Sequence, residues 1–212
     1  MKNPILVFDF DGTIADTHAY IIEISNRLSS EFNYNIIHPD EIDQLKNKTS
    51  QEIIRHLNVP VMKIPAILTK AKKEFHQHIA CVKPIPGLTD ILYRLKELKI
   101  RMGILSSNTP ENIHKFLKNH RLDIFDFVST TSKIWTKNTS LKILIDHEKL
   151  PKNLVIYIGD EIRDITAAKK LGLKVAAVGW GYNSTKSLKK HEPDFLIESP
   201  VQLLALLKQS AA

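Results

Sequence analysis

Two aspartates, Asp9 and Asp11, stand at the end of a short apolar segment near the N-terminus, and Gly12 follows them. Side chains two residues apart at a strand end point to roughly the same side, and Gly12 allows the chain to turn sharply. Paired carboxylates in such a place can hold a hard cation such as Mg²⁺, or one can attack phosphorus while the other moves a proton. The alternative is a loop in which the aspartates only support a turn.

A second acidic cluster, Asp160, Glu161 and Asp164, follows another apolar segment. Asp160 and Asp164 are four residues apart and share a helix face if a helix begins near Asp160. Acids in the first turn of a helix also offset its dipole, which is the plainer interpretation of this cluster alone. Carboxylates behind two separate strands together predict a Mg²⁺ site.

Hydroxyl groups follow a third apolar segment, at Ser106 and Ser107, and the chain continues with Asn108, Thr109 and Pro110. Hydroxyls and free backbone amides at the start of a helix suit a phosphate group. Helix capping by Asn108 or Thr109 is the alternative, and both roles can coexist.

The apolar segments that position these residues lack polar alternation, which is typical of strands covered on both faces of a parallel sheet. They span residues 4–8, 101–105, 154–158 and 174–178, with 125–128 and 195–197 as shorter candidates. Helical patterns at 110–118 and 164–171 lie between them, the second ending at Gly172. This alternation predicts an α/β fold with a doubly wound, Rossmann-like parallel sheet.

Residues 16–83 break the alternation, because their apolar spacing indicates helices and no strand. We therefore predict two domains. Residues 1–15 and 84–212 form the α/β core domain, and residues 16–83 form a smaller all-helical domain inserted after the first strand.

The overall composition sets limits on partners and location. The formal net charge of +7 favours anionic partners, although the basic residues are scattered along the chain. The single cysteine, Cys81, excludes an intramolecular disulfide. No segment approaches the ~18 apolar residues of a membrane span. We expect a cytoplasmic protein with no membrane partner, and leave monomer or dimer open.

The order of these motifs resembles the haloacid dehalogenase (HAD) superfamily. The resemblance rests on Asp9-x-Asp11-Gly12-Thr13, Ser106 after a strand, an intervening lysine, and Gly159-Asp160-x-x-x-Asp164. The helical insertion resembles the type-1 cap of that superfamily. Residues 177–183 and 193–197 are similar to its phosphoglycolate phosphatase-like branch.

This resemblance implies roles for the acidic residues. Asp9 would be the nucleophile that forms an aspartyl-phosphate, and would also bind Mg²⁺. Asp11 would act as general acid and then base, and would offer its backbone carbonyl to the metal. Asp160 would be the second carboxylate ligand, and Asp164 and Glu161 would hold metal-bound water.

The resemblance also implies a phosphate-binding group made of Ser106, the amide of Ser107 and a lysine. Lys137 is our choice for that lysine, with Lys133 and Lys142 as alternatives. Thr13, which closes the first motif, is expected to support the site.

Asp11 distinguishes subclasses of the superfamily, because the dehalogenases of the superfamily lack this second aspartate. The presence of Asp11 therefore favours phosphate-ester chemistry.

Lys46 and Lys48 lie in a polar segment between two helical patterns. They would suit a carboxylate-bearing or doubly charged substrate such as phosphoglycolate, although a plain solvated connection is equally compatible. We therefore expect a Mg²⁺-dependent phosphatase of a small anionic phosphorylated metabolite. A phosphoglucomutase-like transferase is the alternative, and a non-catalytic nucleic-acid-binding protein is the least favoured one.

Overall fold

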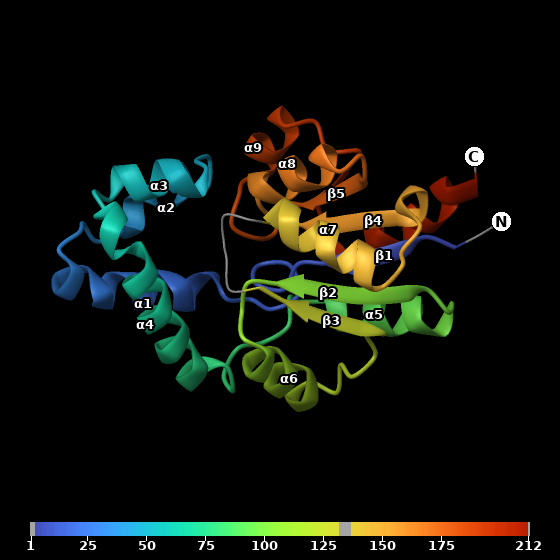
Figure 1. The fold of residues 1–212 in the computed structure, drawn as a ribbon, viewed down its shortest axis with the longest axis horizontal. Helices are drawn as coiled ribbons and strands as arrows, with labels where there is room; N and C mark the ends of the chain where they lie inside the picture. The colour runs from blue at the N-terminus through green and yellow to red at the C-terminus, as the bar shows by residue number, and fades with distance from the viewer. Residues whose placement is uncertain (1–2, 132–136, 212) are drawn as a thin grey trace.

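The computed structural model describes residues 3–131 and 137–211. Its strands form one parallel sheet in the order β3-β2-β1-β4-β5-β6, which confirms the predicted fold class (Figure 1). The strands are β1 (Ile5–Phe8), β2 (Arg101–Ser106), β3 (Phe127–Thr130), β4 (Val155–Gly159), β5 (Lys174–Val178) and β6 (Phe195–Ile197). β1 lies between β2 and β4, and the strand order reverses its direction there. The loops that follow β1, β2 and β4 therefore meet at the carboxyl edge of the sheet.

Both faces of the sheet are covered, which explains the continuous apolar segments. Ile5 and Val7 of β1 belong to one buried cluster, and Leu6 and Phe8 belong to another on the opposite face. The first cluster includes residues of α7 (Lys137–His147), α8 (Ile162–Lys170) and α9 (Thr185–Lys190). The second includes residues of α5 (Leu88–Glu97), α6 (Pro110–Asn119) and the 3₁₀ helix η5 (Pro200–Ala211).

The two helices predicted beside the sheet form close to their expected bounds. α6 begins at Pro110, and Thr109 caps it by accepting a hydrogen bond from the Asn112 amide. α8 ends at Lys170, and Gly172 follows with a φ of +70° that favours glycine.

The described residues between 16 and 83 contain helices and no strand, as predicted. They form α1 (His18–Phe32), α2 (Ile42–Leu45), α3 (Ser50–His56), α4 (Ile64–His78) and the short 3₁₀ helices η1 (Pro39–Glu41) and η2 (Val61–Lys63). Figure 1 shows this helical group to one side of the sheet, with α1 beside α4.

The chain leaves the sheet region and returns to it through two adjacent segments. The Asp16 amide donates to the Lys83 carbonyl at 2.9 Å, and the Ile85 amide donates to the Ile14 carbonyl at 2.9 Å. Both segments therefore lie against each other where the helical group joins the sheet. Among the helices of the described residues, none combines the length and apolar character that a membrane crossing requires.

Candidate active site

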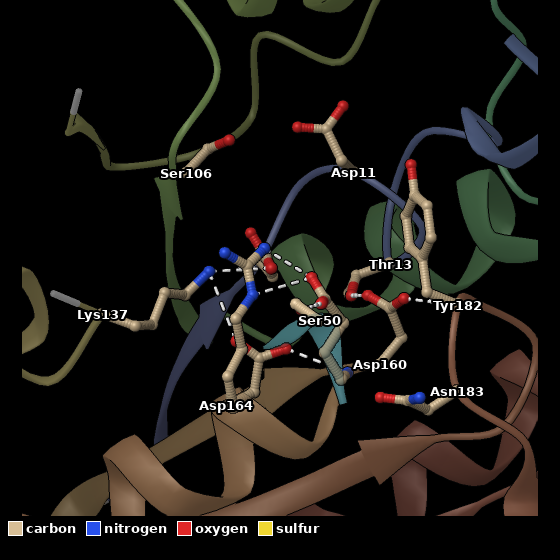
Figure 2. Close-up of polar contacts among 12 residues, drawn as sticks. Asp11, Thr13, Ser50, Ser106, Lys137, Asp160, Asp164, Tyr182 and Asn183 are labelled. Atoms are coloured by element: carbon tan, nitrogen blue, oxygen red, sulfur yellow. Dashed lines mark hydrogen bonds and ion pairs between the residues drawn. The ribbon is translucent and has the colours of Figure 1, made fainter. Parts of the chain in front are cut away.

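The loops behind β1, β2 and β4 meet at the carboxyl edge of the sheet (Figure 2). Phe8 pairs with Ile104 on one side and with Ile158 on the other, so the residues that follow these positions are neighbours. The Asp9 amide donates to the Ile158 carbonyl at 2.7 Å, which extends the pairing to the nucleophile expected from the sequence. The side chains of Asp9, Ser106 and Asp160 are all buried there.

Three buried carboxylates converge at this edge. Asp9, Asp160 and Asp164 each offer an oxygen atom, and these atoms all lie within 4.8 Å of one another. Thr13 Oγ1 donates to Asp160 Oδ1 at 2.6 Å, and the Tyr182 amide donates to Asp160 Oδ2 at 2.7 Å. Burial, followed by the charges of neighbouring carboxylates, raises the pKa of Asp160 well above its usual range.

This donor set fits a hard divalent cation, because it consists of oxygen atoms and carries more negative charge than the buried site can hold unaided. Gly12 contributes to the close packing around it. Its φ is +77°, and a Cβ atom there would lie 2.4 Å from Asp160 Oδ2. A larger residue at position 12 would therefore displace the carboxylate.

Lys137 provides a buried positive charge at the same place. Its Nζ lies 2.7 Å from Asp9 Oδ2 and 3.3 Å from Asp164 Oδ1. Burial alone would lower the pKa of Lys137, but the charges of Asp164 and Asp9 raise it above its ordinary value. Of the two alternative lysines, Lys142 is exposed on α7, and Lys133 lies outside the described residues.

Asp11 is set apart from the three clustered carboxylates (Figure 2). Asn108 Nδ2 donates to both of its carboxylate oxygens, at 3.0 Å to Oδ1 and 3.2 Å to Oδ2. Burial and the charge of Asp9 raise the pKa of Asp11 to about 7, although the bond from Asn108 acts in the opposite direction. Asp11 can therefore carry a proton near neutral pH, as a general acid must.

Ser106 is the last residue of β2, and Ser107 follows it. Ser106 is fully buried, and its Oγ accepts a hydrogen bond from the Asn108 amide at 3.0 Å. Ser107 is half-buried and lines the cavity that also contacts Asp11. Both residues predicted to bind phosphate thus lie at the same edge of the sheet as the carboxylates.

Glu161 lies at the contact between the helical group and the sheet. Its Oε2 accepts a hydrogen bond from Ser50 Oγ at 3.2 Å, and Arg163 Nε donates to its Oε1 at 2.8 Å. Glu161 is absent from the buried carboxylate cluster of the described residues. Asp164 belongs to that cluster, and its Oδ2 also accepts from the Glu161 amide at 3.1 Å.

The segment that carries Lys46 and Lys48 is held against the sheet region by its backbone. Asn183 Nδ2 donates to the Lys46 carbonyl at 3.0 Å and to the Lys48 carbonyl at 2.9 Å. The Ser184 amide also donates to the Lys46 carbonyl, at 2.9 Å. The backbone of this segment is therefore docked, and a role of the Lys46 and Lys48 side chains in substrate specificity stays a prediction.

A cavity of about 380 Å³ extends from Asp11 and Ser107 into the helical group. Its walls are mainly aliphatic and come from the helices of residues 18–75 and the segments between them. Its basic side chains are Lys46, Lys48, Lys72 and Arg163. The cavity can thus receive a group attached to a phosphate bound at the strand ends, next to several positive charges.

Comparison with protein families agrees with this arrangement. The family model described as haloacid dehalogenase-like hydrolase matches residues 6–178, which include the three loops at the carboxyl edge. The chain belongs to this family. The resemblance to the HAD superfamily that the four motifs indicated is thereby confirmed, and the protein is a HAD-like hydrolase.

Two relatives and one solved structure extend the comparison. A phosphoglycolate phosphatase of Synechococcus elongatus is 33% identical over 205 residues, covering 96% of this chain and 97% of the relative. A pyrophosphatase PpaX of Oceanobacillus iheyensis is 24% identical over 222 residues, covering 98% of each chain. A HAD-like hydrolase structure from Streptococcus pneumoniae shares the fold with a TM-score of 0.78 and 19% identity, covering 96% of this chain and 97% of that one.

Several residues of this HAD site were outside the sequence prediction. The Tyr182 amide binds Asp160, and the Asn183 side chain binds the docked segment at Lys46. Both contacts join distant parts of the chain. The signal for them was the polar end of residues 177–183, which the sequence analysis used only for its family likeness. Asn108 was considered, with Thr109, only as an alternative helix cap; Thr109 is the cap, and the bond from Asn108 to Asp11 was not foreseen.

Proposed function

We propose that this HAD-like hydrolase is a Mg²⁺-dependent phosphatase that transfers a phosphoryl group from a small organic phosphate to Asp9 and then to water. One observation carries the proposal. Asp9 is buried, and its Oδ2 lies 2.7 Å from Lys137 Nζ. One carboxylate oxygen of Asp9 also lies within 4.8 Å of an oxygen of Asp160 and an oxygen of Asp164. A carboxylate nucleophile thus lies beside both a fixed cation and a set of oxygen donors for a metal.

In the first step, a carboxylate oxygen of Asp9 attacks phosphorus and the bond from phosphorus to the leaving oxygen breaks. Asp11 gives its proton to that leaving oxygen, so that an alcohol departs. In the second step, Asp11 takes a proton from water, the water oxygen attacks phosphorus, and the bond to Asp9 breaks. Inorganic phosphate and free Asp9 result, and Asp11 is protonated again.

The remaining residues bind the phosphoryl oxygens and balance charge. Lys137, Ser106 and the Ser107 amide offer donors to the equatorial oxygens, where negative charge spreads during transfer. Asp9, Asp160 and Asp164 would hold Mg²⁺, with the backbone carbonyl of Asp11 as a further ligand. When bound, Mg²⁺ supplies positive charge that offsets the repulsion between Asp9 and the incoming phosphate.

Phosphoglycolate is our first candidate substrate. The 33% identical relative bears the name phosphoglycolate phosphatase, and Lys46 and Lys48 line the cavity beside Asp11. A carboxylate on the leaving group would find positive charge there. We also propose that residues 16–83 act as a cap domain over a core of residues 1–15 and 84–212.

The test is phosphate release from a panel of phosphorylated metabolites, with and without Mg²⁺, by the wild-type enzyme and by Asp9→Asn. We expect Mg²⁺-dependent release by the wild type and none by the variant. Undiminished turnover by Asp9→Asn would refute the nucleophile assignment. Transfer to a sugar phosphate without release of inorganic phosphate would indicate the mutase-like alternative.

A further inference from the structure

A row of side-chain hydrogen bonds runs from helix α4 to Asp11. His76 Nδ1 lies 2.5 Å from Asn112 Oδ1, and Asn112 Nδ2 donates to Asn108 Oδ1 at 2.9 Å. Asn108 Nδ2 then donates to both oxygens of Asp11, at 3.0 and 3.2 Å. Each amide in the row uses its oxygen as acceptor and its nitrogen as donor.

The partners of Asn108 fix the direction of its amide. Its Oδ1 accepts from the Thr109 amide at 2.8 Å as well as from Asn112 Nδ2. A flipped amide would place Nδ2 against these two donors and would turn its oxygen toward the carboxylate of Asp11. Asn112 therefore helps to keep a donor, and not an acceptor, facing Asp11.

The fold itself does not call for an asparagine at position 112. The side chain is fully buried, where an aliphatic residue is the common choice. The start of α6 is already capped by Thr109, which accepts from the Asn112 backbone amide at 3.3 Å. The buried amide group is thus explained by its two side-chain partners, His76 and Asn108.

We propose that Asn112 and His76 are positioning residues, which act through Asn108 to hold the carboxyl group of Asp11 toward the leaving oxygen. Asn112 belongs to α6 beside the sheet, whereas His76 lies in the last turn of α4. The row thus ties a helix of the inserted group to the acid of the active site. This inference rests on the proposed function, since Asp11 must transfer a proton for its orientation to matter.

The consequence is a dependence on the leaving group. An alkyl alcohol is a poor leaving group without a proton, whereas p-nitrophenolate leaves readily without one. A misplaced Asp11 should therefore slow the cleavage of alkyl phosphates more than that of p-nitrophenyl phosphate. The ratio kcat/KM reports the steps up to loss of the leaving group, so later hydrolysis of the aspartyl-phosphate does not obscure the comparison.

The experiment measures kcat/KM for p-nitrophenyl phosphate and for the alkyl phosphate that the wild type cleaves fastest. Asn112→Leu keeps the branched shape of the side chain and removes the donor and acceptor. His76→Leu removes only the outer donor, and His76→Gln restores an N–H group. His78→Leu is the matched control, because His78 lies on the same helix and packs against Tyr20.

We expect Asn112→Leu to lower kcat/KM for the alkyl phosphate about tenfold more than for p-nitrophenyl phosphate, as one part of the total effect of a general acid. His76→Leu should give a smaller loss of the same kind, which His76→Gln reverses, and His78→Leu should match the wild type. Equal losses with both substrates, or no loss at all, would overturn the inference. Failure of the proposed function looks different, because the wild type would then release no phosphate, or Asp9→Asn would remain active.

Discussion

The ammonium group of Lys137 lies 2.7 Å from Asp9 Oδ2, and both side chains are almost fully buried. Lys137 is the first residue of α7, whereas Asp9 directly follows β1, so the pair joins a helix start to a strand end. The same Nζ lies 3.3 Å from Asp164 Oδ1. A single lysine thus contacts two buried carboxylates, one of which belongs to the proposed nucleophile.

Replacing Lys137 by methionine should remove this charge with little change in volume. We expect kcat/KM to fall by roughly 10²-fold or more at saturating Mg²⁺, because one fixed donor to the charge of a transition state commonly contributes that much. Steady-state assays of phosphate release measure the effect. Lys142→Met is the matched control, since Lys142 is exposed on the same helix and should retain wild-type activity.

Two results would contradict this role of Lys137. One is a Lys137→Met enzyme with unchanged kcat/KM, and the other is an equal loss in Lys142→Met. Thermal unfolding in Mg²⁺ should accompany the assays. It separates a folded, slow enzyme from one that lost activity by unfolding.

Asp160→Asn should weaken metal binding. The substitution keeps the shape of the side chain but removes one of the three carboxylate charges that share the buried space. We expect the dissociation constant for Mg²⁺, measured by calorimetry, to rise at least tenfold, which corresponds to ~1.4 kcal/mol. Asp146→Asn, at an exposed position of α7, provides the control. Equal Mg²⁺ affinity in the wild type and Asp160→Asn would remove Asp160 from the metal site.

Sequence patterns predicted the strands and the edge of the sheet at which the acids meet, because apolar segments and turn residues are local signals. The place of Asp164 in the carboxylate cluster was predicted, but for a partly wrong reason. α8 begins at Ile162, so Asp160 precedes the helix and does not share its face. Asp164 reaches the cluster because it bonds back to the Glu161 amide in the first turn.

Contacts through the backbone were beyond the reach of the sequence. The segment with Lys46 and Lys48 docks through its carbonyl groups, and every residue type has one. The partner, Asn183, lies far along the chain, and no spacing rule connects it to residue 46. For the same reason the bonds that join His76, Asn112 and Asn108 had no signature in the sequence.

The stability of the metal-free protein should fall as the pH rises through the titration of the buried acids. Burial raises the pKa of Asp11 to about 7 and that of Asp164 to about 6, from an ordinary value of 3.8. Between about pH 4 and pH 7 the folded protein therefore holds protons that the unfolded chain has released. Stability decreases with rising pH under that condition.

Mg²⁺ should reverse this trend, because it binds the ionised carboxylates. We expect the difference in Tm between samples with Mg²⁺ and with EDTA to grow from pH 5 to pH 7.5. The comparison at each pH removes the contribution of groups far from the metal. Asp160→Asn should show a smaller growth, and a difference in Tm that does not vary with pH in the wild type would argue against metal binding by these acids.

The docked segment allows a clean test of substrate charge. The carbonyl groups of Lys46 and Lys48 hold the segment to Asn183, while their side chains line the cavity. Replacing either side chain by methionine should therefore leave the segment in place and remove only a positive charge. We expect each change to lower kcat/KM for phosphoglycolate about tenfold, in line with the loss of a charge-assisted contact. Ethyl phosphate, which has no carboxylate, should be cleaved as before.

Lys73→Met serves as the control, since Lys73 is exposed on α4 and absent from the lining of the cavity. Equal losses for both substrates would show that these lysines act on something other than the carboxylate, and a preference for ethyl phosphate in the wild type would exclude phosphoglycolate as the substrate.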